Sequence, residues 1–490
     1  MAAGDEHDNG ANGPDGGDHD EQPYEFDDDV FRSSRRRASR RVIIKTFEGA
    51  TEGYEDGLEN QFDEAFLEKW AEVMNNYETE LTIRRAFRTV EGDDDHYRPT
   101  LRTYYEVLLP SDRGPAAYAV ADMLRKADLP QIELVYVESP PAPPPNQCGG
   151  RNRFYLDDAP RGMGVNPPQG AGGDPWPLVV VMESVWQPGH PELADVWSMG
   201  GFEGPQGVAE YANLPTESHH ATATLGVLAA AGLAGGPGCP GMLPPEAAPG
   251  FATTHSFDLD TGEWVEALGS QIVAVAENMS AGDILLIERQ IWGRRRGTCG
   301  PGAPREHDLV LSPLELEPHL RAALEQVRDW DIIAIVAAGN GSTAGGVLLN
   351  QTATWDGTAC LLMPGDSAAI LVAACDTVRA NGVHARLPQS NFGAQAVCYA
   401  WGNNVVTLDA SNHSGTWTYR DTSAASALLA GVAARVQSRA MATLGRRLTP
   451  AEMRAALTFT PPGAVAPGRG LNIGVMPNMD DIFAGGLPAA

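Results

Sequence analysis

Four short apolar runs in the second part of the chain constrain its fold more than any other feature. They are PLVVVME at 177–183, DILLIERQ at 283–290, DIIAIVAAG at 331–339 and SAAILVAAC at 367–375. Continuous apolar runs of this length are typical of strands that are covered on both faces. Segments with helical spacing alternate with them, at 219–232, 266–282, 313–330 and 422–441. The alternation predicts an α/β domain, with a parallel sheet flanked by helices.

A smaller unit precedes this domain. Residues 41–138 alternate strand-like and helical stretches and are interpreted as a small α+β domain. The proline-rich stretch 139–152 is expected to be a stiff linker, and the α/β domain is expected over 153–480. Residues 1–40 are expected to form a disordered tail, because the first thirty contain eleven Asp or Glu and no Lys or Arg. The RSSRRRASRR run at 32–41 is interpreted as polyampholyte chain, with an electrostatic clasp or a processing site as the alternative.

The charge balance narrows the classes of partner. The chain has 35 basic and 64 acidic residues, a net charge of −29, which argues against nucleic acid and anionic membranes. The N-terminus lacks the basic start and apolar core of a secretory signal, so a cytoplasmic location is expected, with leaderless export as the alternative. The six cysteines have no metal-ligand spacing and are expected to be mostly reduced. No metal or other cofactor is predicted.

Four polar residues stand where the predicted strands and helices meet. Glu183 ends an apolar run, His220 opens a helical segment, Asn340 follows a run, and Ser423 opens the last long helix. In parallel sheets, catalytic residues gather at such junctions. Each residue alone has a structural explanation, such as a turn, a helix cap or a surface acid. Together they supply a nucleophile, a base, an orienting carboxylate and an oxyanion donor, which predicts acyl transfer.

The blocks around these residues resemble the subtilisin-like serine proteases, or subtilases, over roughly 176–440. VVVMESVWQPGHPEL resembles the block with an Asp seven residues before a His-Pro pair, and Glu183 stands at that Asp. HATATLGVLAA resembles the histidine block with His220 as the base, VAAGN the oxyanion block with Asn340, and DTSAASALLAGVAA the serine block with Ser423. The resemblance implies a subtilisin-like fold and a serine endopeptidase that acts on protein or peptide substrates. His219 is interpreted as a helix-end histidine without a catalytic role.

The sequence departs from the family pattern at four positions, of which Ala427, in place of the Pro of the serine block, is expected to be harmless one turn into the helix. Glu183 replaces Asp, Ala221 replaces the Gly after the histidine, and Asp421 replaces the Gly before Thr-Ser. A carboxylate one methylene longer still orients an imidazole, but a β-carbon is costly wherever the backbone requires positive φ. The departures motivate an alternative function, a catalytically impaired binding or regulatory module with the subtilase fold.

Two further expectations follow from the resemblance. GDILLIERQIWG lies where subtilases pair with the substrate backbone, which makes Glu288 and Gln290 candidate substrate-binding residues. Glu288 would favour a basic side chain before the cut bond, or it would form a surface salt bridge with Arg289. The small N-terminal domain resembles the prodomains of the family and is expected to act as an intramolecular inhibitor, with a permanent accessory domain as the alternative.

Overall fold

The structure is a computed structural model, and it describes the larger part of the chain. The described residues are 41–47, 54, 56–57, 68, 71, 83–87, 90, 98–109, 117–126, 129, 131–138, 141–142, 154–156, 162–165, 175–205, 215–232, 240–294, 309–342, 345–349, 366–376, 384–413, 415–462 and 472–488. The predicted tail over 1–40 and four of the six cysteines lie outside these residues. The other two, Cys375 and Cys398, are buried free thiols.

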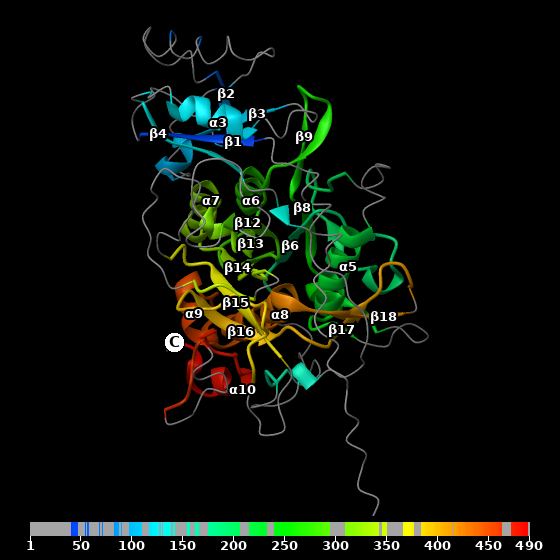
Figure 1. Cartoon of the computed structure of the whole chain (residues 1–490). Helices are drawn as coiled ribbons and strands as arrows, with labels where there is room; N and C mark the ends of the chain where they lie inside the picture. Colours follow the sequence, from blue (N-terminus) through cyan, green and yellow to red (C-terminus); the bar gives the residue numbers. More distant parts are fainter. Residues whose placement is uncertain are drawn as a thin grey trace, which may run out of the picture.

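A seven-stranded sheet forms the centre of the larger domain (Figure 1). Its order is β16-β15-β14-β11-β6-β8-β7, and every neighbouring pair is parallel. The strands are β6 Val179–Glu183, β7 Trp197–Ser198, β8 Gly250–Thr253, β11 Ile284–Ile287, β14 Ile333–Ala337, β15 Ile370–Cys375 and β16 Ala396–Trp401. The four apolar runs supply four consecutive strands of this order, which confirms the predicted fold class.

Helices cover both faces of the sheet, which explains why its strands are apolar throughout. The helices are α5 Pro215–Ala229, α6 Leu268–Glu277, α7 Pro318–Asp329, α8 Asp421–Leu444, α9 Pro450–Leu457 and the short α10 Met479–Asp481. Val179 and Val181 of β6 pack in one cluster with α5 and α8, while Val180 and Met182 pack in another with α6 and α7. Alternation along β6 therefore directs Glu183 to the α5 and α8 side. Among the described helices, none is long and apolar enough to cross a bilayer.

Short strands outside the main sheet were not foreseen from the sequence. They are the hairpin β9 His255–Asp258 with β10 Glu263–Glu266, the pair β17 Val405–Leu408 with β18 Thr416–Tyr419, and a small sheet of β5 Pro141–Ala142, β12 Gln290–Arg294 and β13 Leu309–Ser312. In the small sheet, β12 is the central strand and is antiparallel to both neighbours. Part of the expected linker thus forms a strand against the larger domain.

The N-terminal part forms an antiparallel sheet of order β2-β3-β1-β4. Its strands are β1 Arg41–Thr46, β2 Ile83–Arg85, β3 Tyr104–Leu108 and β4 Ile132–Val137, and the helix α3 Ala117–Lys126 packs on β1 and β4. The sequence indicated all of these except β2; nearly all of the helix expected over 61–77 lies outside the described residues. The apolar side chains of this sheet belong to the same buried cluster as α6 and α7, so the two parts share a core.

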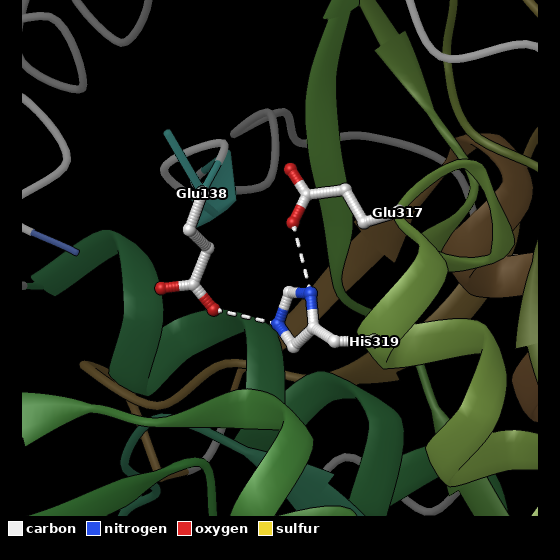
Figure 2. A group of neighbouring side chains, drawn as sticks. All are labelled: Glu138, Glu317 and His319. Carbon is white, nitrogen blue, oxygen red and sulfur yellow. Dashed lines mark hydrogen bonds and ion pairs between the residues drawn. The ribbon is translucent and has the colours of Figure 1, made fainter. Parts of the chain in front are cut away.

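A buried polar group also joins the two parts. The Arg41 guanidinium of β1 donates to Glu138 Oε1 at 2.8 Å, and His319 Nε2 of α7 lies 3.1 Å from that same oxygen. The other ring nitrogen of His319 lies 2.6 Å from the hydroxyl of Tyr136 and 3.6 Å from Glu317 Oε2. Figure 2 shows the two carboxylates at opposite nitrogens of the ring.

The protonation of this group follows from its burial. Burial lowers the pKa of His319, so the ring is neutral, with Nε2–H donating to Glu138 and Nδ1 accepting from Tyr136. Burial alone would raise the pKa of Glu138, but Arg41 and His319 outweigh it, so that this pKa lies below its ordinary value. Both depressed values favour proton uptake on unfolding as pH falls. The contact therefore stabilises the protein near neutral pH and is weakened in acid.

The substitution Glu138→Gln tests this contact. It removes one of the two carboxylates that pair with the buried Arg41, since Glu106 remains its partner, and it leaves His319 beside a neutral amide. We expect it to lower the free energy of unfolding by about 2 kcal/mol. The matched control is Glu133→Gln, because Glu133 is a half-exposed partner of Lys45 at 2.6 Å and such a pair contributes at most about 1 kcal/mol. Denaturant unfolding at pH 7 measures both; equal effects of the two variants would contradict the prediction.

Candidate active site

The end of β6 and the N-terminal half of α5 bring Glu183 and His220 together. Glu183 is the last residue of its strand, and α5 packs directly on β6. Both side chains are buried, and Glu183 Oε1 lies 3.1 Å from His220 Nδ1. The two atoms are at ion-pair distance, but among the described residues neither makes a hydrogen bond. A carboxylate beside Nδ1 is suited to orient the ring once a hydrogen bond forms, which leaves Nε2 to take a proton.

Arg289 balances the buried charge of Glu183 from the other side. Its guanidinium lies 3.6 Å from Glu183 Oε2 and 2.6 Å from Glu266 Oε1, at the end of β10. Burial alone would lower the pKa of Arg289, but Glu266, Glu217 and Glu183 raise it above its ordinary value. Glu288, the preceding residue, is buried and forms no ion pair with Arg289, so its alternative interpretation as half of a surface salt bridge is wrong.

Asn340 stands in a tight turn after β14. Gly339 and Gly341 on either side have φ of +88° and +56°, which only glycine adopts without strain. Asn340 Oδ1 accepts hydrogen bonds from the backbone N–H of Thr422 at 3.1 Å and from its hydroxyl at 2.6 Å, and Asn340 N–H donates to Gln290 Oε1 at 3.0 Å. The Nδ2 amide is buried and has no partner among the described residues. It is a hydrogen-bond donor held ready for an acceptor.

Ser423 lies in the first turn of α8, directly after the residue that contacts Asn340. The Ser426 hydroxyl donates to the Ser423 carbonyl at 2.9 Å and lies 3.3 Å from Glu288 Oε1. This places the start of α8 beside Glu288, and hence in the same region as His220. Among the described residues, however, no hydrogen bond joins the Ser423 hydroxyl to the imidazole of His220.

Tyr419 takes that position at the imidazole instead. Its hydroxyl lies 2.9 Å from His220 Nε2 and donates to Glu288 Oε2 at 2.6 Å. Thr224 lies 2.7 Å from the same hydroxyl and also bonds Glu288. Sequence reasoning missed both residues, although Thr224 is four positions after His220 on one helix face, and Tyr419 is four before Ser423.

Burial dominates the electrostatics of Glu288. It raises the pKa of this carboxyl to about 7, against an ordinary value near 4.5; the proximity of Glu183 adds to the effect, and that of His220 opposes it. The substrate-binding role expected for Glu288 stays a prediction. The side chain of Gln290 supports the Asn340 turn, while its backbone belongs to β12. His219 is half-buried and packs edge-on against Trp417, with ring centroids 5.4 Å apart.

Potential metal ligands cluster at two places among the described residues. Two groups of described side chains bring ligand atoms within 4.8 Å of one another: Glu183, His220 and Glu288, and Glu138, Glu317 and His319. In the first, Arg289 and the Tyr419 hydroxyl already contact the carboxylates and the imidazole. In the second, the carboxylates lie at opposite ring nitrogens (Figure 2). Neither group is arranged around one ion, and we assign no metal to them.

Two residues, Ala221 and Asp421, stand where the family pattern has glycine. One of them adopts the left-handed backbone conformation with positive φ. Asp421 has φ of +67°, donates its N–H to the Gly402 carbonyl at 2.7 Å and accepts a side-chain hydrogen bond from Gln389. Burial raises its pKa to about 6. Aspartate tolerates this conformation better than most residues. Ala221, by contrast, lies inside the right-handed helix α5, where a β-carbon costs nothing.

The comparison with known families agrees with this geometry. Residues 258–471 match the model described as the Subtilase family. This range of the chain is therefore similar to the subtilase family. The matched range includes Asn340 and Ser423, while Glu183 and His220 precede it. The matched family, like the fold, is that of subtilisin-like serine peptidases.

One solved structure supports the fold over most of the chain, and a second is less similar. An alanine variant of the epidermin leader peptide processing serine protease EpiP from Staphylococcus aureus is 13% identical, with a TM-score of 0.50, covering 91% of this chain and 99% of that one. The prenylagaramide maturation protease PagA is 17% identical, with a TM-score of 0.40, covering 65% and 96%. At these identities the likeness concerns the fold alone. No curated protein matches the chain significantly.

Substitutions at Asp421 test the backbone requirement at the start of α8. Asp421→Ala and Asp421→Gly both lose the hydrogen bond from Gln389, so the difference between them reports the positive φ. We expect the glycine variant to be more stable than the alanine variant by about 1 kcal/mol, measured by denaturant unfolding. The control, Ala221→Gly, should instead destabilise by about 1 kcal/mol, because it puts glycine inside a helix. An alanine variant at 421 as stable as the glycine variant would contradict the interpretation.

Proposed function

We propose that this protein is a serine endopeptidase with a Glu183–His220–Ser423 triad. The observation that supports it most is the buried contact of 3.1 Å between Glu183 and His220 Nδ1, at the carboxyl end of a parallel strand. The unpaired amide of Asn340 and the start of α8 lie in the same region. The implied partner is a protein or peptide substrate.

Each residue has a definite role in the proposed reaction. The Ser423 hydroxyl attacks the scissile carbonyl carbon while His220 Nε2 takes its proton and then delivers it to the leaving amine. Glu183 accepts the Nδ1–H hydrogen bond and stabilises the imidazolium. The Asn340 Nδ2 amide and the Ser423 backbone N–H bind the oxyanion, and a donor of this kind contributes about 10²–10³ in turnover.

For this reaction, His220 must exchange its partner. Its Nε2 atom bonds the Tyr419 hydroxyl, so the attack requires that Ser423 replaces Tyr419 at that nitrogen. The described arrangement is then a resting state. The same observation favours the second candidate, a catalytically impaired subtilase-fold binding or regulatory module, in which the exchange does not occur.

The N-terminal domain is proposed to act as an intramolecular inhibitor. The segment that follows it, β5, pairs antiparallel with β12, with Ala142 opposite Gln290 and Pro141 opposite Ile291. Strand β12 begins two residues after Glu288 and carries the side chain that holds the Asn340 turn. An extended segment is thus attached along the strand where a substrate backbone is expected to pair. A location in the cytoplasm stays a prediction from the sequence.

Labelling with a fluorophosphonate tests the proposed nucleophile. We expect the full-length protein to gain one covalent adduct, identified by mass spectrometry on Ser423, because the probe reacts only with an activated hydroxyl. The variants Ser423→Ala and His220→Ala should lose at least 99% of the labelling. Thr422→Ser retains a hydroxyl at the neighbouring position and is the control for the site of modification. Absence of an adduct, also after removal of the small domain, would favour the binding module.

A substitution at the domain contact tests the inhibitor. Glu138→Gln weakens the packing of the small domain on α7 without touching the triad, so it should raise the initial rate of Ser423 labelling several-fold. Glu133→Gln, at a more exposed position within β4, should not change that rate. Equal rates in all three proteins would favour the permanent accessory domain.

A further inference from the structure

His220 lies between two carboxylates, of which the proposed triad uses one. Glu183 contacts Nδ1 directly, and Glu288 reaches Nε2 through the Tyr419 hydroxyl, in steps of 2.9 Å and 2.6 Å. All four side chains are buried. The hydroxyls of Thr224 and Ser426 complete the hydrogen bonds around Glu288. A second carboxylate at this distance from a catalytic base has no role in the reaction as described so far.

The hydrogen bonds along this chain allow two arrangements of one proton. In the first, Glu288 is a neutral acid that donates to the Tyr419 oxygen, and Tyr419 donates to a neutral His220 at Nε2. In the second, Nε2–H donates to Tyr419, and Tyr419 donates to an anionic Glu288. The tyrosine has one O–H bond in both, and only the direction of the two hydrogen bonds differs.

We propose that Glu288 is a positioning residue that shares one proton with His220 through Tyr419, so that it sets the base strength of the imidazole together with Glu183. The proposal rests on the triad proposed above. The transfer is balanced: the proton on Nε2 passes to the Tyr419 oxygen as the proton of that hydroxyl passes to Glu288 Oε2. No charge leaves the group and no co-reactant is required.

This proton-sharing group explains how the resting state can be ready for catalysis. His220 is able to accept a proton from Ser423 only when Nε2 carries none. In the first arrangement, Glu288 holds the proton, and Tyr419 can leave a neutral imidazole. Burial raises the pKa of Glu288 to about 7, so its neutral acid form is accessible near neutral pH. The geometry of the two hydrogen bonds through Tyr419 is what links this acid to the imidazole.

Other charged groups contact the pair from each packed element. Glu183 from β6 disfavours the Glu288 anion, whereas Arg289, after β11, partly neutralises Glu183. Asp421 from α8 is close enough to His220 that an imidazolium lowers the pKa of that carboxyl. Glu183, Arg289 and Asp421 do not lie between His220 and Glu288. The hydrogen bonds through Tyr419 are therefore the direct connection, and a substitution at Tyr419 removes it.

The pH dependence of kcat/KM tests the proposal. Glu288→Gln keeps the size of the side chain but removes a charge that favours the imidazolium. We expect the acidic limb of the profile to move to lower pH by roughly half to one unit. Ser426→Ala removes a hydrogen bond of 3.3 Å from the same carboxyl without changing its charge, and its limb should not move. A purely structural role of Glu288 would lower the rate without moving the limb.

The second carboxylate should act mainly through the tyrosine. In a Tyr419→Phe background, the Glu288→Gln shift of the acidic limb should therefore shrink by at least half, which is a non-additive effect of neighbouring groups. A shift of the same size with and without Tyr419 would overturn the proton-sharing group and leave only a charge acting through space.

A measurement without turnover separates this proposal from the proposed function. In the Ser423→Ala variant labelled with ¹⁵N-histidine, the His220 ring signals, assigned by their loss in His220→Asn, can be titrated directly. Adding Glu288→Gln should lower the titration midpoint by roughly half to one pH unit. An unchanged midpoint would overturn the proposal even in an active protease, whereas a shifted midpoint supports it even if no activity is found.

Discussion

A carboxylate buried at the end of a parallel strand is the constraint on which the rest of this site depends. Burying the Glu183 carboxylate costs free energy unless neighbouring groups compensate its charge. Three elements contribute such groups. His220 comes from α5, Arg289 from the segment after β11, and Glu266 holds Arg289 from the end of the hairpin. The hairpin β9–β10 is linked in turn to the small domain, where Arg84 contacts Asp258 at 3.0 Å. The charge of Glu183 thus connects elements that are far apart in the chain.

The sequence was sufficient for four neighbouring strands of the sheet, and it proposed the polar residues at their ends, because both follow from patterns along the chain. Continuous apolar runs predict strands covered on both faces, and the side chains after such strands collect at one edge. In β6, for example, Val179, Val181 and Glu183 are alternate residues and therefore point to the same face of the sheet. The four site residues identified from the sequence are, for this reason, found near one another around the carboxyl ends of β6 and β14 and the start of α8.

What the sequence could not indicate are contacts that depend on how separate elements pack. Tyr419 belongs to a short strand whose pairing with β17 decides where its hydroxyl lies, and no periodicity marks it. Glu288 follows an apolar run and was interpreted as a pocket or surface residue; only the packing of α5 and α8 shows that it is buried. The sequence indicated that a side chain at position 421 is costly only if the backbone there has positive φ. The structure shows that it does, because Asp421 has positive φ and donates its N–H to the Gly402 carbonyl where α8 begins. Pairings as short as β5 with β12 have no signature in a single sequence.

That last pairing has a consequence for how a competitor could reach the site. Strand β5 is covalently attached to the molecule it occupies, and a segment held by a short tether competes at an effective concentration of about a millimolar. A free peptide with similar contacts to β12 would have to exceed that concentration to displace it. If the small domain inhibits as proposed, access to the edge of β12 depends on how often that domain and its attached strand detach, rather than on how much peptide surrounds the protein.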